Sequence, residues 1–168
     1  KQNSNSLSNN NVLSIIEDHN GNIWIGTDGG GVNYLNKKNN RFSHFKYDAQ
    51  NPNSIGSDYN IHIYEDSDKD LWVANYKGGL NLLKKGSNHF TRVKISGTKQ
   101  SYHTFSSILQ DKKGRIWLGT FGNGVSIYDK KTQKFIHLQS ESGLANLTIF
   151  TLFEDKKGKI WIGTEDGG

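Results

Sequence analysis

Residues 108–128 read ILQDKKGRIWLGTFGNGVSIY, and variants of this pattern occur four times along the 168-residue chain. The other copies span residues 15–35 (IIEDHNGNIWIGTDGGGVNYL), 63–83 (IYEDSDKDLWVANYKGGLNLL) and 152–168 (LFEDKKGKIWIGTEDGG). The shared core is an acid or Gln, then Asp-x-x-Gly-x, an apolar residue, Trp, a second apolar residue and Gly-Thr. The tryptophans lie 44 to 48 residues apart, a period that indicates a repeat architecture.

Each repeat has the local signals of four short strands. In the first repeat, runs rich in β-branched and aromatic residues predict strands over 12–17, 22–27, 32–36 and 41–47. Asp-x-x-Gly between the first two predicts a hairpin turn, because Asp bonds its own backbone and Gly accepts a positive φ. No segment places apolar residues at helical spacing behind an N-cap. The chain is therefore expected to be all-β.

A tandem unit of four strands in about 45 residues is typical of a β-propeller blade. The predicted blades span residues 12–47, 59–94, 103–138 and 147–168, and the last is incomplete because it contains only two strands. About three and a half blades would leave an unpaired sheet edge. We therefore expect a fragment of a larger propeller.

The composition excludes several classes of protein. The chain has no Cys, which removes disulfides, thiolate zinc sites and cysteine nucleophiles. It has no apolar stretch of about 18 residues that would predict a membrane-spanning helix. The net charge of +5 permits acidic partners but does not require nucleic acid, and no nucleic-acid partner is predicted.

No motif in the chain predicts a metal, a cofactor or a catalytic residue. Residues 66–70 alternate acids as a calcium loop does, but they lack the Gly and the distal Glu of that loop. The six His residues share no ligand spacing. The sequence also lacks a nucleophile elbow and a phosphate-binding loop.

The repeated Trp and Asp residues are predicted to be structural, since a catalytic or stacking role would not require a copy in every blade. The Trp residues should fill the space between adjacent blades, and the Asp residues should cap turns. The residues concerned are Trp24, Trp72, Trp117 and Trp161, and Asp18, Asp66, Asp111 and Asp155. The second repeat departs from the pattern, with Lys69 for the turn Gly and Ala74-Asn75 for Gly-Thr. Its turn is expected to differ in type, and its blade to be distorted or specialised.

The blocks EDHNGNIWIGTDGGGVNYL (17–35) and QDKKGRIWLGTFGNGVSIY (110–128) resemble the two-component regulator propeller repeat. The resemblance covers all four periods. It implies the periplasmic ectodomain of an inner-membrane sensor, of the Bacteroidetes hybrid two-component type, that recognises glycan-derived ligands. It further implies that the propeller signals to a histidine kinase beyond a membrane segment, so the membrane is reached only through parts outside this sequence.

Two other propeller repeats fit less well. The sialidase-type Asp box has the spacing Asp-x-Gly-x-x-Trp, whereas this chain has Asp-x-x-Gly-x-x-Trp. In the WD repeat, Asp follows Trp. Here the residues that follow Trp are Ile25, Val73, Leu118 and Ile162.

Topology predicts which face of the blades carries a ligand. Loops between the second and third strands share a face with the crossings between blades, expected over 48–58, 94–102 and 139–146. The position four residues after each Trp opens on this face and differs in every repeat. These residues are Asp28, Tyr76, Phe121 and Glu165. Tyr76 and Phe121 could stack on sugar rings, and Lys77 and Arg92 could pair with sulfate or carboxylate groups. The alternative is that all six are solvated loop residues.

The predicted partner is an oligosaccharide, and the positive net charge favours an acidic one. A second possibility is a protein–protein interaction scaffold that forms a homodimer through the full ectodomain. A third is a carbohydrate-active propeller enzyme, which would need a unique acid–base pair that the sequence does not reveal.

Overall fold

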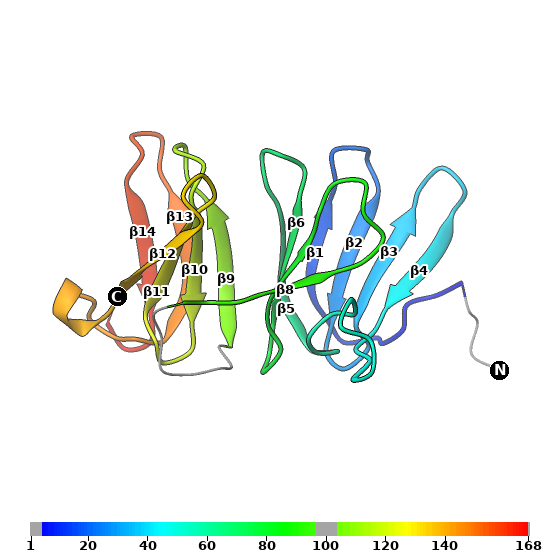
Figure 1. The fold of residues 1–168 in the computed structure, drawn as a ribbon, viewed down its shortest axis with the longest axis horizontal. Helices are drawn as coiled ribbons and strands as arrows, with labels where there is room; N and C mark the ends of the chain where they lie inside the picture. The colour runs from blue at the N-terminus through cyan, green and yellow to red at the C-terminus, as the bar shows by residue number, and fades with distance from the viewer. Residues whose placement is uncertain (1–4, 97–103, 168) are drawn as a thin grey trace. The chain divides into compact units, whose positions relative to one another are not determined.

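The computed structural model describes residues 5–96 and 104–167, and their regular structure is almost entirely β. The strands form three four-stranded antiparallel sheets and one two-stranded sheet (Figure 1). A single 3₁₀ turn, η1 (Ser140–Ser142), is the only helical element in these ranges. The predicted all-β fold is therefore confirmed. The chain divides into two compact units, Lys1–Val93 and Lys94–Gly168.

The first unit contains two meander sheets, ordered β1-β2-β3-β4 and β5-β6-β7-β8. The strands are β1 (Val12–Glu17), β2 (Ile23–Thr27), β3 (Val32–Asn36), β4 (Arg41–Phe45), β5 (Asn60–Glu65), β6 (Leu71–Asn75), β7 (Gly79–Leu83) and β8 (Thr91–Val93). The fourth strand ends two residues earlier than expected. Tyr47 leaves the ladder, and its amide donates to Asp58 Oδ1 at 2.7 Å.

The second unit contains one meander sheet, β9-β10-β11-β12, and the two-stranded sheet β13-β14. The strands are β9 (Phe105–Gln110), β10 (Ile116–Thr120), β11 (Val125–Asp129), β12 (Lys134–Leu138), β13 (Ile149–Glu154) and β14 (Ile160–Thr164). Each predicted blade range encloses one sheet. Residue 103, the expected start of the third blade, and most of the 94–102 crossing lie outside the described residues.

In both units the sheets pack through the first strand of the later sheet. β5 packs against β1 and β2, and β13 packs against β9 and β10. The Gly of Gly-Thr permits this approach. A Cβ on Gly26 would lie 2.8 Å from the Asn60 carbonyl oxygen, and one on Gly119 would lie 2.8 Å from the Ile149 side chain. The close approach of the next sheet therefore requires glycine at Gly26 and Gly119, whereas the second repeat has Ala74 at this position.

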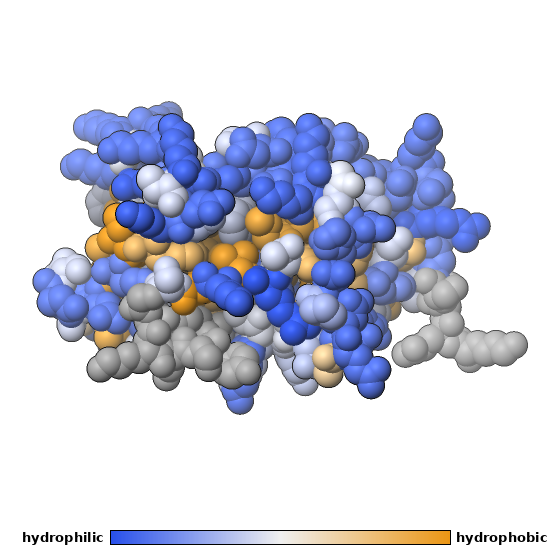
Figure 2. Space-filling view, viewed as in Figure 1, coloured by the Kyte–Doolittle hydropathy of each residue, from blue (hydrophilic) through white to orange (hydrophobic). Residues whose placement is uncertain are grey.

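Tryptophan fills the space between the two sheets of each unit. Trp24 is buried in a cluster with Val32, Ile55, Ile63, Leu71, Val73, Leu83 and Phe90. Trp117 is buried with Val125, Ile127, Ile149 and Leu152. Figure 2 shows hydrophobic residues in a band between the turn-bearing ends of the strands, which are hydrophilic. Trp72 is also buried, whereas Trp161 on the two-stranded sheet is 61% exposed.

The repeated Asp joins its turn to the tryptophan. Asp18 Oδ1 accepts from the amides of Asn20 and Asn22, both at 2.9 Å. Asp18 Oδ2 accepts from Trp24 Nε1 at 3.0 Å. The equivalent indole bonds are 2.8 Å for Trp72 to Asp66, 2.8 Å for Trp117 to Asp111 and 3.1 Å for Trp161 to Asp155. One carboxylate thus closes the hairpin and satisfies an indole N–H.

The second repeat keeps the same turn, so the expectation of a different type was wrong. Lys69 has φ 69°, close to the 80° of Gly21 and the 82° of Gly114. Its amide donates to the Asp66 carbonyl at 2.9 Å, and in the first repeat the Gly21 amide donates to the Asp18 carbonyl at 2.8 Å. A side chain is unfavourable in this left-handed region, so the second repeat retains the turn at a local conformational cost.

The second repeat is specialised at the Gly-Thr position instead. In the first repeat, Thr27 Oγ1 donates to the Gly31 carbonyl at 2.8 Å. Asn75 replaces that Thr and forms a buried chain of side-chain amides with Asn60 and Asn81. In this sheet, a network of three side-chain amides thus replaces the single hydrogen bond of the Thr hydroxyl.

Candidate functional site

The position four residues after each repeated Trp has one backbone environment and four different side chains. Its amide donates to the carbonyl of the residue just before the first strand of the same repeat. The bonds are Asp28 to Asn11 (3.0 Å), Tyr76 to Tyr59 (2.9 Å), Phe121 to Thr104 (3.1 Å) and Glu165 to Thr148 (3.0 Å). The four positions are therefore structurally equivalent, as expected, and their role in binding stays a prediction.

The side chains at this position differ in their exposure and in their contacts. The Asp28 carboxylate accepts from Asn11 Nδ2 at 2.8 Å. Tyr76 is exposed, and Lys77 Nζ lies 5.2 Å from the centroid of its ring. Glu165 is exposed. A cation over an aromatic face places positive charge beside the ring that is predicted to stack.

Phe121 has an aromatic neighbour that the repeat pattern does not reveal. The rings of Phe121 and Phe150 are 6.0 Å apart and meet edge to face at 72°. Both are exposed, Phe121 by 38% and Phe150 by 53%. Phe150 is the second residue of β13 and lies outside the shared motif. The second unit therefore presents an exposed pair of rings at the predicted binding face.

Arg92 is occupied within the chain rather than directed to solvent. Its Nη2 donates to Ser54 Oγ at 2.9 Å, and its Nε donates to the Ser54 carbonyl at 3.3 Å. The guanidinium also lies over the Tyr47 ring, 5.4 Å from its centroid. These contacts hold the 48–58 crossing against β8. Arg92 therefore anchors this loop, and its predicted contact with an acidic ligand stays a prediction.

Backbone bonds fix the Gly-rich loops to the crossings in both units. Two amides of each loop converge on one carbonyl of the crossing. Gly29 and Gly31 donate to Asp58 at 3.1 and 2.9 Å, and Gly122 and Gly124 donate to Leu147 at 3.1 and 2.8 Å. Gly31 has φ 81°, and a Cβ there would lie 2.3 Å from the Phe45 carbonyl oxygen. These glycines are therefore structural, and backbone hydrogen bonds hold the loops in place on the crossing face.

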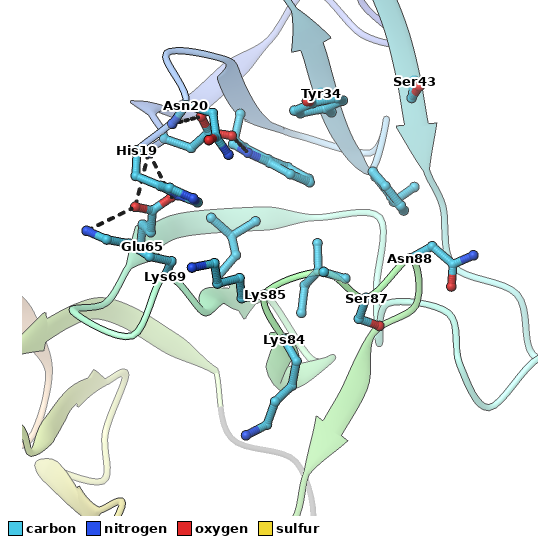
Figure 3. A pocket seen from close by; sticks show the side chains of 16 residues that line it. His19, Asn20, Tyr34, Ser43, Glu65, Lys69, Lys84, Lys85, Ser87 and Asn88 are labelled. Atoms are coloured by element: carbon cyan, nitrogen blue, oxygen red, sulfur yellow. Dashed lines mark hydrogen bonds and ion pairs between the residues drawn. The ribbon is translucent and has the colours of Figure 1, made fainter.

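A cleft of about 560 Å³ opens at the other end of the first unit, beside the hairpin turns (Figure 3). The turns before β2, β6 and β8 contribute to its walls together with β3 and β4. Its apolar lining is Trp24, Tyr34, Phe45, Leu71 and Leu83, and its charged lining is Asp18, Glu65, Lys69, Lys84 and Lys85 with His19 beside them. This cleft lies at the end opposite to the face predicted from topology, so the sequence did not predict it.

Burial and hydrogen bonds determine the charge of the acid and the phenol in this cleft. Burial raises the pKa of Asp18, but bonds from Trp24, Asn22 and Asn20 outweigh it and hold that pKa below its usual range. Burial and the negative charge of Asp18 raise the pKa of Tyr34. At neutral pH, Asp18 is therefore an anion and Tyr34 a neutral phenol.

Among residues 5–96 and 104–167, no group of three or more His, Cys, Asp or Glu side chains could hold a metal ion. In the same ranges, no helix has the length and hydropathy needed to cross a lipid bilayer.

The family model for the two component regulator propeller matches four segments of the chain, 6–29, 54–77, 99–122 and 143–166. Together they make up more than half of its length. The chain belongs to the two component regulator propeller family. Each matched segment of this regulator propeller contains one Asp turn and its Trp, so the matches follow the period seen in the sequence and in the sheets.

This regulator propeller is also similar to solved structures. The chain is 28% identical to the extracellular domain of a hybrid two component system, BT3049, from B. thetaiotaomicron, with a TM-score of 0.75. The match covers 94% of this chain and 21% of that one. The extracellular domain of a second such system, BT4673, matches at 22% identity and a TM-score of 0.74, over 94% of this chain and 22% of that one. The regulator propeller thus spans about a fifth of these ectodomains and is a segment of a larger propeller.

A propeller enzyme shares the fold alone. The chain is 12% identical to virginiamycin B lyase from Staphylococcus aureus, with a TM-score of 0.69, and the match covers 100% of this chain and 56% of the lyase. A comparison with curated proteins gave no match.

Proposed function

We propose that this regulator propeller is a non-catalytic part of a periplasmic sensor ectodomain, which recognises a glycan-derived ligand and signals to a histidine kinase. The observation that supports the proposal most strongly is the set of four family repeats, combined with 28% identity to a hybrid two component ectodomain over 94% of the chain. The coverage of about a fifth of that ectodomain leaves room for further blades that share the task.

The crossing face supplies a surface suited to sugar recognition. Phe121 and Phe150 form an exposed aromatic pair in the second unit, and Tyr76 with Lys77 forms an exposed ring and cation in the first. The C–H faces of pyranose rings pack on such aromatics. Because the backbone at Tyr76 and Phe121 is held by hydrogen bonds, the rings are presented on a rigid scaffold.

The proposal is tested by calorimetric titration of neutral and acidic oligosaccharides into the complete ectodomain that contains these blades. Phe121→Ala and Phe150→Ala should each weaken binding by about tenfold, equivalent to ~1.4 kcal/mol. Ile136→Ala is the matched control, because Ile136 is a comparably exposed apolar residue on β12 in the same unit. Tyr76→Ala tests the first unit separately.

Three outcomes are informative. Binding that falls with Phe121→Ala but not with Ile136→Ala supports a sugar site on the crossing face. Binding that survives all the aromatic variants keeps the sensor function and moves its site to other blades. No binding by any oligosaccharide would contradict glycan recognition and favour the dimerisation scaffold.

A further inference from the structure

The cleft of the first unit lies at the hairpin end of the blades and takes no part in the site proposed above. Its volume of about 560 Å³ falls within the range of ~300–1,000 Å³ that is usual for small-ligand sites. Its lining comes from both sheets of the unit, so any ligand in it would contact two consecutive repeats.

The apolar side of the cleft contains aromatic rings that a ligand can reach. Tyr34 and Phe45 are half-buried, and their rings lie 4.5 and 5.7 Å from that of Trp24, between centroids. Figure 3 shows Tyr34 and Ser43 on neighbouring strands of the first sheet, with Ser87 and Asn88 on the turn below them. An apolar wall opposite polar side chains is the usual composition of a small-molecule site.

The acids of the cleft already have hydrogen-bond or ionic partners within the chain. The Asp18 carboxylate accepts from Trp24 and from its own turn. The Glu65 carboxylate lies 3.1 Å from His19 Nδ1 and 4.0 Å from Lys69 Nζ (Figure 3). Neither acid is therefore available as the counter-ion of an additional cation at this cleft.

One cation of the cleft is left for a ligand. Lys84 lies 3.7 Å from the Asp70 carboxylate, and Figure 3 shows it pointing away from the other labelled side chains. The ammonium of Lys85 has no acidic partner within residues 5–96, although its backbone amide donates to Asp70 at 2.9 Å. The Asn20 side chain, on the opposite turn, offers an amide to the same space.

The equivalent junction of the second unit lacks the aromatic wall. Trp24 pairs with Tyr34 across β2 and β3, whereas Trp117 pairs with Ile127 across β10 and β11. The counterpart of Phe45 is Leu138, since both face the first residue of the third strand. The aromatic wall is therefore not required by the blade junction, because the second unit packs with aliphatic residues in its place.

We infer that this cleft binds the ring of an acidic saccharide, with Tyr34 and Phe45 against the ring and Lys85 paired with its carboxylate or sulfate. The amide of Asn20 and the hydroxyl of Ser43 would bond ring hydroxyls. A charge-assisted bond to a single lysine makes the site selective for anions. The saccharide class rests on the proposed function, whereas the preference for an anion rests on the cleft itself.

The test compares two disaccharides that differ by one carboxylate, cellobiouronic acid and cellobiose, in calorimetric titrations of the complete ectodomain at 0.05 and 0.3 M salt. Cellobiouronic acid should bind at least about tenfold more tightly at low salt and lose much of that advantage at high salt, because screening weakens the pairing with an exposed lysine. Lys85→Ala should remove the preference for the acid. Lys38→Ala is the control, an exposed lysine on the β3–β4 turn outside the cleft.

A second variant separates binding from folding. Tyr34→Ile introduces the residue that the second unit carries at this position and should weaken both disaccharides with little change in melting temperature. Equal affinities for the two disaccharides, or equal effects of Lys85→Ala and Lys38→Ala, would overturn the inference. So would tighter binding of a tri-glutamate peptide than of cellobiouronic acid, since the site would then recognise an acidic peptide.

The variants also separate this inference from the proposed function. Phe121→Ala should leave the binding of cellobiouronic acid unchanged, because Phe121 lies in the other unit. If Phe121→Ala abolishes that binding while Lys85→Ala does not, the acid binds at the crossing face. That result would support the proposed function and overturn the inference about the cleft.

Discussion

The backbone amide of Lys112 donates to the Glu154 carboxylate at 3.0 Å, and this bond joins the two sheets of the second unit. His19 and Glu65 make the same bond in the first unit, at 3.1 Å. In both cases the donor follows the turn Asp of one repeat, and the acceptor precedes the turn Asp of the next. The glutamate that precedes the turn Asp therefore accepts a bond from the preceding repeat, whereas the turn Asp accepts bonds from its own repeat.

This bond predicts that two glutamates at the same repeat position contribute differently to the free energy of unfolding. Glu65 is 14% exposed and bonds His19, whereas Glu17 is 59% exposed and lies 3.5 Å from the Lys37 ammonium. Glu65→Ala should lower the free energy of unfolding by about 1–3 kcal/mol, because it removes the charged and mostly buried acceptor of the His19 amide. Glu17→Ala should change it by less than about 1 kcal/mol. Urea denaturation measures both, and equal losses would contradict the assignment.

The Asp111 turn predicts an acid-dependent loss of stability. Burial raises the pKa of Asp111, but bonds from Trp117 and Arg115 and the Arg115 charge outweigh it, so the pKa lies below its usual range. A carboxyl whose pKa is lower in the folded state stabilises the fold above its unfolded pKa of ~3.9 and loses that contribution as the pH falls through the folded pKa. Asp111→Asn should therefore be less stable than wild type at pH 7, and the gap should narrow below about pH 4.

Denaturant titrations at pH 7, 4 and 3 measure this gap directly. Indole fluorescence reports on the same site, since Asp111 accepts the Trp117 Nε1–H at 2.8 Å. A difference between Asp111→Asn and wild type that is the same at all three pH values would show that the carboxylate charge contributes nothing.

The left-handed lysine predicts a pair of substitutions with opposite signs. Lys69→Gly should stabilise the chain by about 0.5–1 kcal/mol, because Gly adopts φ 69° without a steric penalty. Gly114→Lys, the reverse change at φ 82° in the third repeat, should destabilise it by a similar amount. A Cβ on Gly114 would meet nothing closer than 3.9 Å, so only the backbone conformation is tested. Thermal melts of the two variants should shift in opposite directions; shifts of the same sign would refute this account.

The contacts of Arg92 predict that it stabilises a loop. Arg92→Ala should increase hydrogen exchange in the 48–58 crossing, because the Ser54 carbonyl and hydroxyl lose their donor. Arg92→Lys should restore little, since an ammonium cannot reproduce two directed bonds and the contact with Tyr47. Exchange in the 139–147 segment of the second unit is the internal control. If exchange over 48–58 is unchanged and acidic ligands bind less tightly, Arg92 is a ligand residue after all.

The strands and the Asp turns could be predicted from sequence because their signals are local. Alternating apolar residues and Asp-x-x-Gly specify a hairpin within about ten residues. The contacts between repeats could not be predicted in this way. The partner of Glu65 is 46 residues away and donates through its backbone, so no side-chain pattern marks the pair. Lys69 misled the prediction because hydrogen bonds to Asp66 hold a turn that its own residue type disfavours.

In the candidate sites too, local features could be predicted and contacts between repeats could not. Topology placed Tyr76 and Phe121 at equivalent positions because the repeat fixes their backbone. It did not find Phe150, which reaches Phe121 from another repeat, or the wall of Tyr34 and Phe45, because aliphatic residues stand at these positions in the third repeat. It also did not find the contacts of Arg92 with the Ser54 carbonyl and hydroxyl, because no residue pattern marks these acceptors.

The uniform backbone bond four residues after each Trp has an evolutionary consequence. The amide that donates belongs to Asp28, Tyr76, Phe121 or Glu165, and the bond is the same length to within 0.2 Å whether the side chain is acidic or aromatic. The scaffold therefore makes no demand on what this residue carries. Such positions can change their chemistry one at a time while the blade stays folded, so propellers built on the same skeleton can diverge in specificity without passing through unstable intermediates.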